Sequence, residues 1–111
     1  MSETRAPRGL GDGGKRLWRS VTGEFDLAEH ELAQLEQACR VRDRIGDLDG
    51  LVSDEGLMLA SSQGARLHPA VAEARQQRLA LARLLVTLGV PDANDDLPAA
   101  GKARGVYGGK R

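Results

Sequence analysis

The hydrophobic pattern along the chain predicts three helices separated by short irregular segments. Apolar residues recur at three- and four-residue steps, which is the spacing of an amphipathic helix. Leu17, Trp18 and Val21 fall on one face of a short first helix, predicted over about residues 14–22 and ended by Gly23. We expect the tryptophan to anchor this helix on the rest of the domain rather than to stack on a nucleic-acid base.

A long second helix is predicted over about residues 27–54. Asp26 stands at the expected N-cap, and Glu29 follows at the three-residue spacing of a capping box. The apolar positions at helical spacing are Leu32, Leu35, Ala38, Cys39, Val41, Ile45, Leu48, Leu51 and Val52. Gly46 and Gly50 each lower helix stability by up to roughly 1 kcal/mol relative to alanine, so these are the positions where the helix could bend or end early.

The outer face of this helix carries two pairs of opposite charge at helical spacing. Glu36 and Arg40 are four residues apart, and Arg44 and Asp47 are three apart. Residues three or four apart are neighbours on a helix surface, and such pairs are worth a few tenths of a kcal/mol each. We therefore expect two surface ion pairs here.

Residues 56–67 interrupt the helical pattern and predict a small hairpin or an extended loop. Two short apolar runs flank a Ser-Gln-Gly turn at residues 62–64. A proline then opens a third helix over about residues 69–88, with His68 as its expected cap and Gly89 at its end. The predicted fold class is all-α: a short N-terminal helix, then a long antiparallel helical hairpin with a small β-like turn between its two long helices.

The apolar arc of the third helix is wider than one partner helix covers. At about 100° per residue, one stripe contains Val71, Ala74, Leu81, Leu84, Leu85 and Leu88. Leu79, Ala82 and Val86 extend this stripe around the side, with Arg75 among them. The predicted core residues are Trp18, Leu35, Cys39, Leu81 and Leu85. Because so small a core often needs further support, we expect a neighbouring subunit to cover the Leu79–Val86 side.

Charge is unevenly distributed although the 111-residue chain is neutral overall, with 16 basic and 16 acidic side chains. Residues 1–23 hold five basic and two acidic side chains, residues 98–111 hold four basic and no acidic ones, and residues 24–97 hold seven basic and fourteen acidic ones. Glycines concentrate at both ends. We therefore predict flexible basic tails over residues 1–13 and 92–111, flanking a helical oligomerisation core over residues 14–91.

The histidines, the single cysteine and the glycine-rich segment favour no catalytic or metal chemistry. His30, Cys39 and His68 are the only soft metal ligands, and their spacing matches no metal motif. A lone cysteine excludes an internal disulfide. The glycine-rich residues 9–15 look faintly like a phosphate loop but lack its spacing. We expect no catalytic residue, no metal and no cofactor, and the absence of an apolar leader or span predicts a cytoplasmic protein that does not enter a membrane.

The basic N-terminal end is the part most suited to a partner. The candidate DNA-binding residues are Arg5, Arg8, Lys15, Arg16 and Arg19, which could neutralise backbone phosphates. The alternative is a merely solubilising tail. In an oligomer, several copies of this end on one rim would create a substantial positive field and avidity.

The order of the motifs resembles the terminase small subunit family of tailed bacteriophages. The matching residues are Gly14 to Val21, Phe25-Asp26-Leu27, Glu31, Leu35, Ala38-Cys39, Asp43, Gly64, His68-Pro69, Arg75, and Leu81, Leu84, Leu85, Leu88 and Gly89. The resemblance covers about residues 14–91. It implies a small helical protein that forms a homo-oligomeric ring, binds double-stranded viral DNA, and delivers it in the host cytoplasm to a large subunit carrying the ATPase and nuclease. The chain itself would not be an enzyme.

The sequence is also compatible with two other functional classes. A small helical adaptor would use its basic ends on an acidic protein surface and would not bind DNA. A repressor would need a short, polar recognition helix, which neither long helix provides. Arg75 would either form an ion pair across the subunit interface with an acidic residue of the second helix, which we favour, or face DNA.

Overall fold

The computed structural model describes residues 4–90, which form three helices and one short hairpin. The elements in chain order are α1 (Asp12–Glu24), α2 (Glu29–Glu55), β1 (Met58–Leu59), β2 (Arg66–Leu67) and α3 (Pro69–Leu88). The described part is thus mostly helical, with a minimal antiparallel sheet between the two long helices, as predicted. None of its helices has the length and apolar character needed to cross a membrane.

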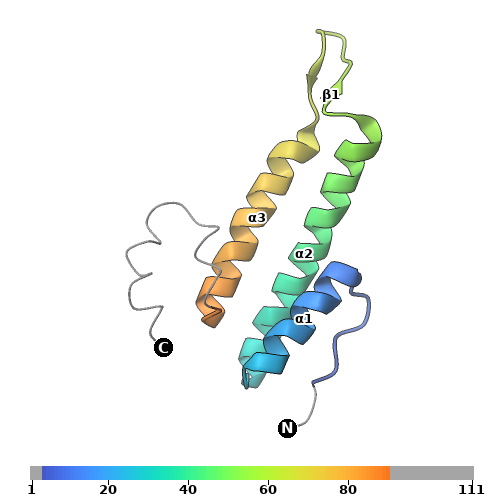
Figure 1. Ribbon diagram of the computed structural model, residues 1–111. Helices are drawn as coiled ribbons and strands as arrows, with labels where there is room; N and C mark the ends of the chain where they lie inside the picture. Colours follow the sequence, from blue (N-terminus) through green and yellow to red (C-terminus); the bar gives the residue numbers. More distant parts are fainter. Residues whose placement is uncertain (1–3, 91–111) are drawn as a thin grey trace.

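The helices are arranged around α2. Figure 1 shows α2 and α3 side by side along their length, joined at one end by the β1–β2 hairpin, which projects beyond the helices. α1 packs against the N-terminal half of α2, away from the hairpin (Figure 1). The end of α2 that continues into the hairpin therefore has α3 beside it but not α1.

The start of α2 differs from the predicted capping box. The helix begins at Glu29, and its N-cap is Ala28, which has no side-chain acceptor. Glu31 Oε1 instead accepts a hydrogen bond from Ala28 N at 2.8 Å. The prediction of Asp26 as the cap was therefore wrong. The glutamate of the capping interaction is Glu31 rather than Glu29, and its side chain accepts from the amide of the N-cap residue.

α2 continues to Glu55 without a break at its two internal glycines. A Cβ added at Gly46 or Gly50 would meet nothing within 4 Å, so both glycines lie where no packing depends on them. Contact with α3 along the helix outweighs their low propensity. Of the two predicted ion pairs, Arg40–Glu36 forms at 2.6 Å; Arg44–Asp47 does not form in the described structure.

α3 has the predicted bounds because residues that start and end helices stand at both of its ends. His68 Nδ1 accepts a hydrogen bond from Ala70 N at 3.0 Å, and Pro69 occupies the first turn, where an N–H is not needed. Gly89 ends the helix in the left-handed conformation, with φ of 85°. The capping role of His68 is confirmed. Its Nε2 lies 2.7 Å from Glu55 Oε1, which ties the start of α3 to the end of α2.

Two groups of side chains make up the core. One is a cluster between α1 and α2 that contains Leu10, Trp18, Val21, Leu35 and Cys39. The other buried residues on the facing sides of α2 and α3 are Ala38, Ile45, Ala70, Ala74 and Ala82. The second group is rich in alanine. Three alanines of α3 are more buried than its leucines, which lie half-buried beside them.

This packing corrects the expected position of Ala82. The sequence pattern placed Ala82 on the side open to a neighbouring subunit, but its side chain is only 1% exposed within the single chain. Ala82 is therefore buried within α3, as Ala70 and Ala74 are. The three buried residues of α3 are thus all alanines, and the leucines of the predicted stripe are only half-buried.

The N-terminal segment also differs from its prediction as part of a flexible tail. Leu10 is buried in the α1–α2 cluster, and Ala6 is partly buried against it. Trp18 Nε1 donates a hydrogen bond to the Thr4 carbonyl at 3.0 Å. Residues 4–11 therefore lie along the helices as part of the domain. The predicted tail over residues 92–111 falls outside the described residues, as do residues 1–3.

Candidate nucleic-acid interface

The outward face of α1 is basic. Lys15, Arg16 and Arg19 are all exposed, and they lie on the side of the helix opposite the buried Trp18 and Val21. Lys15 and Arg16 are four and three residues from Arg19, so the three side chains are neighbours on one helix surface. Because the opposite face is fixed in the core, these charges are held in a constant relation to the domain.

Arg5 and Arg8 extend this basic face through the N-terminal segment. Both are exposed. The segment that carries them is attached at Thr4 by the Trp18 indole and at Leu10 by burial. All five candidate DNA-binding residues therefore belong to the ordered domain. The sequence pattern did not reveal this attachment, because Leu10 is a single apolar residue among glycines.

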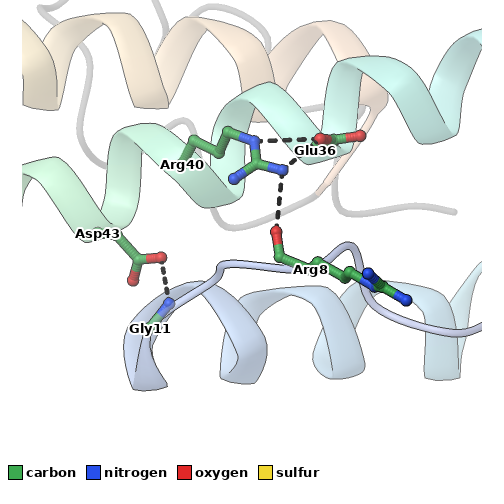
Figure 2. A network of polar contacts seen from close by, with 5 residues as sticks. All are labelled: Arg8, Gly11, Glu36, Arg40 and Asp43. Carbon is green, nitrogen blue, oxygen red and sulfur yellow. Dashed lines mark hydrogen bonds and ion pairs between the residues drawn. The ribbon is translucent and has the colours of Figure 1, made fainter.

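Asp43 of α2 holds the N-terminus of α1. Its Oδ2 accepts from Gly11 N at 2.7 Å and its Oδ1 from Gly14 N at 2.8 Å; Figure 2 shows the contact with Gly11. Free amides at a helix N-terminus attract anions, and here an internal carboxylate meets that need. The glycine-rich loop thus binds an anionic group, and that group is the Asp43 carboxylate of the same chain.

Gly14 is required at the crossing of α1 and α2. A Cβ at this position would lie 2.9 Å from the Cys39 carbonyl oxygen and 2.5 Å from Asp43 Oδ2. Both distances are shorter than side chains tolerate, and one neighbour is backbone that cannot easily move. Glycine therefore lets α1 approach α2 closely enough for both Asp43 hydrogen bonds to form.

Arg40 makes a second connection between α2 and the N-terminal segment. Its Nε and Nη2 donate to Glu36 Oε2 at 3.1 and 2.6 Å, and Nη2 also reaches the Arg8 carbonyl at 3.3 Å. Figure 2 shows the Arg8 guanidinium pointing away from Arg40. Arg40 is thus occupied in positioning the backbone, while the Arg8 side chain stays free to meet a partner.

A shallow open depression lies where α1 meets the middle of α2. It has a volume of about 530 Å³ and is lined by Gly9, Gly11, Asp12, Gly13, Arg16, Arg42, Asp43, Gly46 and Asp47. Arg42 is exposed and passes Gly13, where an added Cβ would be 3.4 Å from Arg42 Cγ. The basic face therefore gains one arginine from α2 that the charge pattern of the sequence did not indicate. Asp12 and Asp47 give the same depression negative charge.

Cys39 is chemically inert in this setting. Burial is the largest cause that raises the pKa of its thiol from the ordinary 9.0 to about 12; the nearby Asp43 and Glu36 carboxylates also raise it, and Arg40 lowers it in part. The thiolate is the reactive form of cysteine, and it is strongly disfavoured here. Cys39 packs in the core. Among residues 4–90, no three His, Cys, Asp or Glu side chains come together in a way that could hold a metal.

The other three residues predicted at a subunit interface differ in their exposure within the single chain. Leu79 and Val86 are half-buried, and Arg75 is exposed without an ion pair in the described part of the chain. The ion pair between α3 and α2 is made instead by Arg78, whose Nη2 lies 2.6 Å from Asp49 Oδ2. Leu81 and Leu85, assigned to the core, are half-buried, whereas Trp18, Leu35 and Cys39 are buried.

Comparison with known proteins finds no match among protein-family models, curated proteins or solved structures.

Proposed function

We propose that this chain is the small subunit of a phage terminase, which recognises viral DNA and presents it to a catalytic large subunit. The observation that carries the proposal is the ordered basic face of Arg5, Arg8, Lys15, Arg16 and Arg19 on a small helical domain. The order of motifs along residues 14–91 supports the same assignment. In this proposal the chain is not an enzyme, needs no cofactor and acts in the host cytoplasm.

DNA binding by this face would be electrostatic. Arginine and lysine side chains that neutralise phosphates release counterions, so affinity falls steeply as salt rises. The contacts of Asp43 and Arg40 support this role indirectly, because they hold α1 and the N-terminal segment in one arrangement before DNA arrives. Side chains that are already positioned lose less conformational entropy on binding. Sequence preference would then come from DNA shape and bending more than from base contacts.

A homo-oligomeric ring would multiply this weak contact. We propose that α2 and α3 act as a long antiparallel helical hairpin that forms the scaffold of the ring. The α3 side with Arg75, Leu79 and Val86 would provide contact between neighbouring subunits. Each copy then adds one basic face to a common rim, and simultaneous contacts raise the overall affinity without any new interaction. The large subunit would dock on the assembled ring.

The proposal is tested by measuring the affinity of the full chain for double-stranded DNA by fluorescence anisotropy over a range of salt. Arg16→Ala and Arg19→Ala should each weaken binding, and the double variant should lower the salt slope by roughly one for each phosphate that is no longer neutralised. Arg83→Ala, which removes one exposed arginine from α3, is the matched control and should bind as the wild type does. Equal affinity and slope for the double variant and the wild type would reject this face as the DNA site.

Absence of DNA binding by the wild-type chain at low salt would reject the terminase assignment itself. It would leave the adaptor class, in which the basic face meets an acidic protein.

A further inference from the structure

Two arginines from different helices line the shallow depression between α1 and α2. Arg16 belongs to α1 and Arg42 to α2, and both residues are exposed. Within residues 4–90 neither guanidinium has an ion-pair partner, whereas Arg40 and Arg78 are each paired with a carboxylate. Arg42 stands outside α1 and the N-terminal segment, which carry the five residues of the proposed DNA site. The packing of the domain therefore gives no role to this second free cation.

Gly13 in the first turn of α1 brings the two arginines together. A Cβ added at Gly13 would lie 3.4 Å from Arg42 Cγ and 3.7 Å from Arg42 Nε, so the Arg42 side chain runs across this glycine. Arg16 is three residues beyond Gly13, and residues at this spacing are neighbours on one face of a helix. The side chain from α2 therefore meets α1 beside Arg16, at the depression that both arginines line.

Three carboxylates line the same depression without pairing with these arginines. Both oxygens of Asp43 accept hydrogen bonds from the backbone, at Gly11 N and Gly14 N. Asp12 and Asp47 are exposed, and in the described part of the chain neither forms an ion pair. Both guanidinium groups thus keep their donors free for an anion from outside. The two exposed carboxylates oppose such an anion, so removing one of them should strengthen its binding.

We propose that Arg16 and Arg42 together hold one backbone phosphate of DNA between α1 and α2. A guanidinium group suits this task because its planar donors match the oxygen atoms of a phosphate. The inference rests on the proposed function and deepens it by extending the DNA site from α1 onto α2. DNA on the basic face of α1 then also contacts the helix that packs against α3.

Fluorescence anisotropy of the full chain with a double-stranded DNA fragment tests this contact. Arg42→Ala should weaken binding roughly three- to tenfold at low salt, because a charge-assisted hydrogen bond to phosphate is lost. Arg44→Ala is the matched control, since Arg44 is also an exposed arginine of α2 and does not line the depression. It lies about 200° further around the helix, so this variant should bind DNA as the wild type does.

The salt dependence shows whether the two arginines hold the same phosphate. Each neutralised phosphate contributes about 0.9 to the slope of log affinity against log salt. The double variant Arg16→Ala with Arg42→Ala should therefore lower the slope by about one, because a single phosphate is lost. A fall of about two would mean two separate phosphates and would reject the shared contact.

Two further variants separate a DNA contact from a structural role of Arg42. Arg42→Lys keeps the positive charge and should retain the salt slope of the wild type. Asp47→Asn removes a negative charge from the depression and should bind DNA roughly twofold more tightly at low salt. Because Arg42 is exposed, Arg42→Ala should unfold in urea as the wild type does. A structural role would instead lower the free energy of unfolding and leave the salt slope unchanged.

The outcomes distinguish failure of this inference from failure of the proposed function. Unchanged affinity of Arg42→Ala, beside weakened binding by the variant with Arg16→Ala and Arg19→Ala, would overturn the inference and keep the DNA-binding role of α1. Unchanged or weaker binding by Asp47→Asn would also overturn it, because DNA would then lie away from the depression. Absence of DNA binding by the wild type would reject the proposed function, and this contact with it.

Discussion

Asp43 Oδ1 on α2 lies 2.8 Å from Gly14 N in the first turn of α1, so a carboxylate 29 residues away in the chain caps the short helix. The other oxygen of the same carboxylate accepts from Gly11 N. α1 has no side-chain cap of its own at Gly11. One acidic residue of the neighbouring helix therefore helps the buried face of α1 to fix the orientation of the basic face.

Replacing this carboxylate should loosen α1. Asp43→Asn keeps the size of the side chain but loses the charge and turns one acceptor into a donor that faces an amide. We expect a loss of about 1–3 kcal/mol in the free energy of unfolding, measured by urea denaturation. Asp47→Asn, at an exposed position one turn further along α2, is the control and should stay within about 0.5 kcal/mol of the wild type. Equal losses in both variants would contradict the capping role.

Gly14→Ala tests the close crossing of α1 and α2. The added methyl group would overlap the Cys39 carbonyl oxygen, so the two helices must separate. We expect destabilisation of about 1–3 kcal/mol. Gly50→Ala is the matched change in open space, and it should stabilise the chain by up to about 1 kcal/mol because alanine is the better helix former. The opposite signs of the two effects are the diagnostic result in thermal or urea unfolding.

Leu10→Ala tests whether the N-terminal segment belongs to the domain. Leu10 is 5% exposed in the cluster with Trp18, so its truncation should cost about 2 kcal/mol or more. Leu57→Ala removes the same atoms from a side chain that is 55% exposed and should change the free energy of unfolding little. If Leu10→Ala were equally neutral, residues 4–11 would not be packed against the helices in solution.

The Cys39 thiol should be unreactive in the folded chain. With a pKa of about 12, only about one thiol in 10,000 is ionised at pH 8. Alkylation at pH 8 should therefore be slow in buffer and fast in urea, with a rate that follows the unfolded fraction. Rapid alkylation under native conditions would contradict the buried position of this residue.

The same raised pKa gives a pH dependence of known sign. Folding keeps the thiol protonated, so the stabilisation linked to Cys39 is fully present below pH 9 and is lost as pH rises from about 9 towards 12. Urea unfolding between pH 8 and 11 should show the wild type losing stability relative to a Cys39→Ala chain. A constant difference between the two chains over this range would contradict the raised pKa.

The parts of the fold that could be predicted are those set by residues that start or end an element. The bounds of α3 follow from a proline at its start and a glycine after its end, and the position of the hairpin follows from the turn residues 62–64. These signals act over a few residues, so the sequence contains them directly. The same holds for the Arg40–Glu36 ion pair, which needs only a helix.

The contacts that shape the candidate site act over long separations in sequence. From the sequence alone, Asp43 is one more acidic residue on the solvated face of a helix, and Arg40 is half of a surface ion pair. Their contacts with α1 and the N-terminal segment become visible only in the three-dimensional structure. Leu10 and Ala82 were misjudged for the same reason. Their burial is decided by which neighbour reaches them in three dimensions, and helical periodicity within one element does not carry that information.

One measurement tests the central claim, that this chain is a DNA-binding homo-oligomer, most directly. It is the mass of the species formed by the full chain with a double-stranded DNA fragment at low salt, determined by analytical ultracentrifugation. The account predicts a discrete assembly of several subunits on the DNA, which releases the DNA as salt is raised. A monomer that sediments identically with and without DNA would contradict it.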